Sequence, residues 1–173
     1  INRGDFILPD ILSRHKLPVV KFTLNLLKKR LSEKDFFEVL RFKNINGQNC
    51  LHSIENGVDF VINFAKNSLP IVELRELLSE NDNFNMLPLH RAVEVCTVDN
   101  IKHYLSIYKD TFSKEELETL LQNCKTLIYH KNFNILELAA SNPDFDSLKI
   151  LMEFIGADLL KNMLSDKPES FRK

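Results

Sequence analysis

The chain has 173 residues, of which 44% are hydrophobic and 27% charged, with a net charge of −1. This balance is typical of a globular domain with a sizeable core, and only four glycines argue against long disordered linkers. No apolar run approaches the roughly 18–20 residues of a membrane span. The first residue is Ile rather than Met and no signal peptide follows, so we expect a piece of a longer protein. Three cysteines without framework spacing favour an intracellular, cytoplasmic setting.

The start of the chain predicts two helices. Pro9 opens a short one over residues 5–12. The next carries one apolar stripe at helical spacing, formed by Val20, Leu24 and Leu27. Lys28, Lys29 and Arg30 end that helix, where its dipole favours cations. We expect the stripe to be core.

Charge is distributed unevenly along the chain. Residues 1–43 carry a net charge of +5, and residues 44–173 carry −6. A basic start could contact nucleic acid, an acidic protein or the acidic remainder of its own polypeptide, and it could equally be a solvated helix face. We favour the solvated face, and nucleic acid is not the partner that the rest of the sequence indicates.

A turn followed by a leucine and a histidine recurs along the chain. Residues 82–92 contain an Asx-rich turn and then Leu-Pro-Leu-His-Arg-Ala, and residues 44–52 repeat the layout with Gly47 in the place of Asn85. Residues 132–140 repeat it again with Glu137 in the histidine place. A weaker copy opens the chain around Leu8. The repeated structural positions are Leu51, His52, Leu89, His90, Leu136 and Ala139.

Extra residues separate these copies, because successive motif leucines lie 43, 38 and 47 residues apart. Amphipathic stretches at 31–40, 70–78 and 113–121 precede the second, third and fourth copies. Ser113 and Glu116 have the spacing of a capping box, and Pro70 suits a first helical position. Each stretch predicts a short third helix that links one copy to the next turn, and residues 159–164 predict a final capping helix.

The turn, the Leu-His pair and the two helices that follow resemble the ankyrin repeat. The resemblance implies an all-α, ankyrin-like helical solenoid with linking helices, in one domain over residues 1–173 with approximate repeats 1–42, 43–80, 81–128 and 129–173. The main structural alternative is an armadillo-like or HEAT-like array, whose repeats of about 40–47 residues fit the spacing better. The Leu-His turn favours the ankyrin interpretation.

The resemblance implies a module that binds a partner protein through a concave face of turn tips and inner helices. The tip residues expected to bind are Asn46, Gln48, Phe84, Met86 and Phe133. The inner-helix residues expected to bind are Ser53, Glu55, Arg91 and Glu94. His52 and His90 are expected to brace their turns by hydrogen bonding to backbone.

The sequence has no motif typical of a catalytic or metal-binding site. No Gly-rich phosphate loop, no nucleophile beside a base and no ligand set at zinc spacing occurs in the sequence. We therefore expect no enzyme activity, no catalytic residue, no metal and no cofactor within this chain. Two other functions stay open: a structural or regulatory segment that packs on a neighbouring domain of a larger protein, and a nucleic-acid contact through the basic N-terminal region.

Overall fold

A computed structural model describes residues 8–95, 97–124, 126–128, 131–143 and 145–165. These residues form a helical protein with one small two-stranded ribbon. Within them, no helix is both long and apolar enough to cross a membrane.

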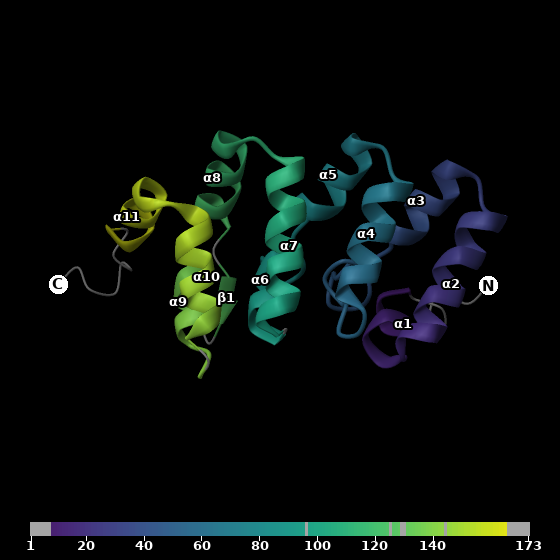
Figure 1. Cartoon of the computed structure of the whole chain (residues 1–173), viewed down its shortest axis with the longest axis horizontal. Helices are drawn as coiled ribbons and strands as arrows, with labels where there is room; N and C mark the ends of the chain where they lie inside the picture. Colours follow the sequence, from purple (N-terminus) through teal and green to yellow (C-terminus); the bar gives the residue numbers. More distant parts are fainter. Residues whose placement is uncertain (1–7, 96, 125, 129–130, 144, 166–173) are drawn as a thin grey trace.

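The elements follow each other in a row from one end of the molecule to the other (Figure 1). The first segment contains α1 (Leu8–Arg14), α2 (Leu17–Arg30) and α3 (Glu33–Arg41). The second contains α4 (Val58–Ser68) and α5 (Ile71–Ser79). The third contains α6 (Pro88–Val95), α7 (Val98–Thr111) and α8 (Lys114–Asn123). The last contains β1 (Thr126–Ile128), β2 (Lys131–Phe133), α9 (Ile135–Ala140), α10 (Asp146–Ile155) and α11 (Ala157–Ser165).

Helices form at the three predicted stretches, as α3, α5 and α8, and α11 lies where a final helix was expected. Their starts follow local capping chemistry. Ser113 and Glu116 form the reciprocal capping box predicted for α8. The Ser32 side chain likewise accepts from the Asp35 N–H at the start of α3. Pro70 precedes the first helical residue of α5 rather than occupying it.

Helices in equivalent places of successive segments pack against each other. α4 packs on α7 and α7 on α10, while α6 packs on α9 and α3 on α5. Their apolar faces join into one core that extends from Leu8 to Met163. Exposed ion pairs cross the same boundaries, including Lys66 with Asp110 at 2.6 Å. Such pairs contribute at most about 1 kcal/mol each, so burial of apolar surface holds the row together.

The second segment departs from the expected pattern. Leu51 and His52 lie in a turn between loop and α4, not on an inner helix. The spacing explains the difference: the residue that precedes α4, Gly57, follows His52 by five positions, whereas Thr97 follows His90 by seven. Too few residues remain to complete a helix, and the Asn49 side chain instead caps the Leu51 N–H at 3.0 Å. The prediction of an inner helix in this segment is therefore wrong.

A β-ribbon replaces the turn expected at the start of the fourth segment. β1 and β2 pair antiparallel, with Thr126 opposite Phe133 and Ile128 opposite Lys131. Phe133 is thus a strand residue rather than an exposed tip, and its side chain is half-buried. The fold class is helical as predicted, with this ribbon as the exception that the helical periodicity did not indicate.

Candidate partner-binding surface

Two loops share one hydrogen-bonding pattern although they lie 38 positions apart in the sequence. In residues 44–48 the N–H of the first residue donates to the carbonyl of the fifth at 3.0 Å, and in residues 82–86 the same bond measures 2.9 Å. In both loops the side-chain oxygen of the first residue accepts from the N–H groups of the third and fifth. The third and fifth residues of each loop are therefore held by a side-chain oxygen of the same loop.

Gly47 and Asn85 occupy the same position of the two loops, as predicted. Both have positive φ angles, 74° and 58°. Glycine and asparagine are the residues that tolerate this left-handed region most readily. The sequence correspondence between these residues is therefore a structural correspondence as well.

Neighbouring loops are also bonded to each other. The Asn83 N–H donates to the Asn46 carbonyl at 2.9 Å, and the Asn83 side-chain amide donates to the Ile45 carbonyl at 3.0 Å. A Cβ added at Gly47 would lie 2.8 Å from the Asn83 backbone nitrogen, so the first loop has no room for a larger residue there. The two tips thus form one continuous surface with a fixed relative position.

His52 braces this arrangement from below. Its Nε2 hydrogen-bonds with the Met86 carbonyl at 3.0 Å, while its Nδ1 lies 3.2 Å from the Asn49 backbone nitrogen and 2.8 Å from the Asn49 side-chain oxygen. Burial lowers the pKa of His52 to about 4, so the ring is neutral at pH 7. The expected bracing role is confirmed for this histidine, which joins one loop to the next.

His90 is buried at the equivalent position in the third segment. Burial lowers its pKa to about 4, although the Asp82 carboxylate and the Cys124 backbone favour the charged form. Neither ring nitrogen reaches hydrogen-bonding geometry with a residue that the structure describes. The bracing role expected of His90 therefore stays a prediction.

Two tyrosines of α7 fasten the second segment to the third. The Tyr104 hydroxyl donates to the Leu51 carbonyl at 2.6 Å, and the Tyr108 hydroxyl donates to the Leu78 carbonyl at 2.5 Å. Both side chains are buried. These two hydroxyls give buried backbone carbonyls a hydrogen-bond donor. They therefore stabilise the segments from which the two loops extend.

At the tip of the second loop, Phe84 is 44% exposed and lies over the Arg91 guanidinium, 5.0 Å from ring centroid to Cζ. Arg91 Nε donates to the buried Asp82 carboxylate at 2.9 Å, and its Nη1 donates to Glu94 at 2.5 Å. The Phe84 ring therefore packs on the half-buried Arg91 guanidinium, which is itself held in place by Asp82 and Glu94. Arg91 and Glu94 were expected to be free for a partner, and they are instead engaged with each other.

The remaining predicted residues divide into two groups. Asn46 and Glu55 are exposed, and Gln48 is half-buried. Met86 is only 2% exposed, and Ser53 is also buried, so neither presents a binding surface and both expectations are wrong. Met86 ends its loop where the chain turns into the core, and Ser53 lies in the tight turn that replaced the inner helix. The predicted motif positions Leu51, Leu89, Leu136 and Ala139 are all buried.

Sequence reasoning missed the most exposed apolar residue of this surface. Ile45 is 90% exposed in the first loop, next to the Asn46 that was singled out. A lone isoleucine between two asparagines in a predicted turn was the available signal, since a turn tip has no core to bury it. We call Ile45 and Phe84, with the backbone of the two loops between them, the tip surface.

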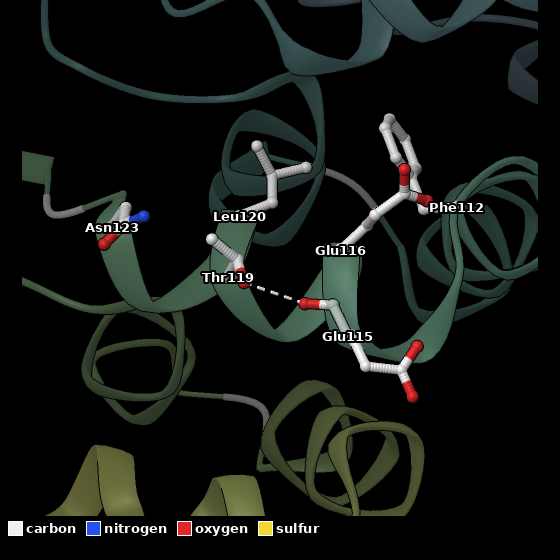
Figure 2. Close-up of a pocket in the computed structure, with 6 residues that line it drawn as sticks. All are labelled: Phe112, Glu115, Glu116, Thr119, Leu120 and Asn123. Carbon is white, nitrogen blue, oxygen red and sulfur yellow. Dashed lines mark hydrogen bonds between the residues drawn. The ribbon is translucent and has the colours of Figure 1, made fainter.

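The surface of the molecule also has a shallow depression, whose lining side chains do not converge on one point as a ligand site would require. It has a volume of about 470 Å³, opens widely to solvent, and is lined by Phe112, Glu115, Glu116, Thr119, Leu120 and Asn123 (Figure 2). Glu116 is committed to an ion pair with Arg75, which lowers the pKa of that carboxyl to about 2. The Thr119 hydroxyl donates to the Glu115 carbonyl at 2.8 Å. Glu116 and Thr119 are thus already paired within the protein.

The described cysteines are poor nucleophiles. Burial raises the pKa of the Cys50 thiol far above its usual range and that of Cys124 to about 11. Within the described ranges, no group of three His, Cys, Asp or Glu side chains converges as a metal site would require.

Comparisons of the chain with protein-family models, curated proteins and solved structures find no match.

Proposed function

We propose that the chain is an ankyrin-like repeat module of a helical solenoid, and that it binds a partner protein through the tip surface. The main support for this proposal is the pair of equivalent loops, which are joined by hydrogen bonds from Asn83 to the carbonyls of Asn46 and Ile45. An aromatic and an aliphatic side chain are thereby held outward on a backbone that is already fixed. Because little conformational freedom remains to be lost on binding, such a surface favours affinity.

The chemistry of the tip surface favours a protein over other partners. Ile45 and Phe84 are apolar, the other residues of the two loops include four asparagines, and the charges of Asp82, Arg91 and Glu94 are paired with each other. Interfaces of proteins commonly combine an aromatic or aliphatic anchor with a polar rim. We therefore expect the partner to supply an apolar patch with hydrogen-bonding groups around it, in the cytoplasm of its cell.

The test uses Ile45→Ser with Phe84→Ser, and Arg91 is left intact because replacing it would leave the buried Asp82 carboxylate unpaired. A partner is first captured with the wild-type chain and then titrated with each variant. The serine pair should weaken binding by about 2 kcal/mol or more. Ile71→Ser with Val72→Ser is the matched control, because these residues are also apolar and exposed but lie at the end of α5 that is farther along the chain from the second loop.

Circular dichroism should show an unchanged helical spectrum for both variants, since all four side chains are exposed. Equal binding by the wild-type chain and the Ile45/Phe84 variant would contradict the proposal. Weakened binding by the α5 control alone would move the site to that helix.

A further inference from the structure

An apolar stripe is exposed along α2, the outermost long helix at one end of the row (Figure 1). Val19, Phe22 and Leu26 are 43%, 69% and 41% exposed. At roughly 100° of rotation per residue, the three side chains fall within one narrow sector of the helix. Scattered exposed apolar residues are ordinary, but three on one face of one helix form a patch. We call these three residues the α2 stripe.

The α2 stripe points away from the rest of the protein. Lys21 Nζ lies 5.1 Å from the Phe60 ring centroid and Lys28 Nζ lies 5.6 Å from that of Phe64, so the lysine side of α2 faces α4. By the same rotation, both lysines lie roughly opposite the stripe. The core side of the helix, with Val20 and Leu24, lies between the two.

The equivalent positions on the next helix are covered. α2 and α4 end alike, since the N–H groups of Leu31 and Leu69 bond to the carbonyls of Leu27 and Ala65. This alignment, an offset of 38 positions, matches Phe22 to Phe60 and Leu26 to Phe64.

Phe60 and Phe64 are partly buried and pack against the core beneath the lysines of α2. The same alignment matches Lys28, which donates to Ser68 on α4, to Lys66, which pairs with Asp110 on α7. The α2 stripe is therefore the equivalent packing surface on α2, and no helix that the structure describes covers it.

Charge indicates what kind of helix fits there. No acidic residue occurs between Asp10 and Glu33, and α2 ends with Lys28, Lys29 and Arg30. Lys29 and Arg30 lie within or beside the sector of the stripe by helical rotation. A second copy of α2 packed antiparallel would bring these cations onto the Lys16 end of its partner, so self-association through this face is opposed by repulsion.

We propose that the α2 stripe docks an amphipathic helix of a partner protein whose flanking charges are acidic. The apolar side of that helix covers Val19, Phe22 and Leu26, as α2 itself covers the aromatic pair of α4. Its carboxylates pair with Lys29 and Arg30. The stripe involves none of the tip-surface residues, so this second site stands or fails independently of the proposed function.

The test measures binding of a synthetic amphipathic peptide of about 18 residues, with leucines on one face and glutamates on its flanks, by fluorescence anisotropy. A peptide with lysine in place of each glutamate and a single-stranded DNA oligonucleotide are the comparison ligands. Phe22→Ser with Leu26→Ser should weaken binding of the glutamate peptide about tenfold or more. Lys29→Glu with Arg30→Glu should transfer the preference to the lysine peptide.

Ile71→Ser with Val72→Ser is the control for removing exposed apolar side chains elsewhere, and it should leave peptide binding unchanged. The proposal is overturned if the glutamate peptide does not bind saturably up to about 1 mM, or if the Phe22/Leu26 variant binds it as tightly as wild type. It is equally overturned if charge reversal leaves the peptide preference unchanged. DNA binding that survives loss of the stripe, without peptide binding, would identify a polyanion surface instead.

Discussion

Replacing Gly47 with alanine tests whether the two loops are built as described. The Gly47 φ of 74° costs an L-residue roughly 1–2 kcal/mol. The new Cβ would also lie 2.8 Å from the Asn83 nitrogen, which must move away and weaken its 2.9 Å bond to Asn46. Loss of such a bond costs about 1 kcal/mol. Gly47→Ala should therefore lower the free energy of unfolding by about 2–3 kcal/mol.

Asn85→Gly is the matched control, because it changes the equivalent position in the opposite direction. Glycine accepts the φ of 58° without strain, and the exposed bond from Asn81 to the Asn85 side chain is lost. We expect a change within about 0.5 kcal/mol. The assay is urea denaturation followed by circular dichroism, with the slope m checked for each variant. A Gly47→Ala midpoint equal to that of wild type would refute the loop geometry and the equivalence drawn from it.

Three other changes probe the supports of the tip surface. Tyr108→Phe removes the donor to the buried Leu78 carbonyl and should cost about 1–2 kcal/mol by urea denaturation; no loss would mean that water or another donor replaces it. Leu89→Ala should cost roughly 2–5 kcal/mol as a fully buried leucine, and an unshifted midpoint would place it outside the core. Because the folded pKa of His52 is depressed from 6.5 to about 4, the unfolded chain binds the proton more tightly. The contribution of His52 to stability should be complete above pH 6.5 and be lost between pH 6.5 and 4, by up to about 3 kcal/mol, and His90, whose pKa is lowered to the same value, should add a similar loss; a pH profile of His52→Gln identical to that of the wild type would contradict this.

The sequence predicted those features that local chemistry determines. The Ser113 and Glu116 capping box marks the start of α8, and the correspondence of Gly47 with Asn85 follows from a backbone conformation that few residues adopt. The leucines and alanine of the repeated motif were correctly placed in the core from their shared motif position.

What the sequence did not predict depends on tertiary context. Met86 is buried, and its backbone carbonyl bonds to His52, which lies 34 positions away in the sequence. The Arg91 side chain was expected to be free for a partner. The local sequence does not show that the loop brings the Asp82 carboxylate into an ion pair with it. The ribbon likewise depends on pairing between residues 126–128 and 131–133, and each of these strands is too short to show a clear period-two pattern.

Hydrogen–deuterium exchange of the chain with and without its captured partner tests the central claim most directly. If the tip surface is the binding site, residues 44–48 and 82–86 should exchange more slowly in the complex, while residues 71–79 of α5 should be unchanged. Slower exchange confined to segments other than the two loops would contradict the account.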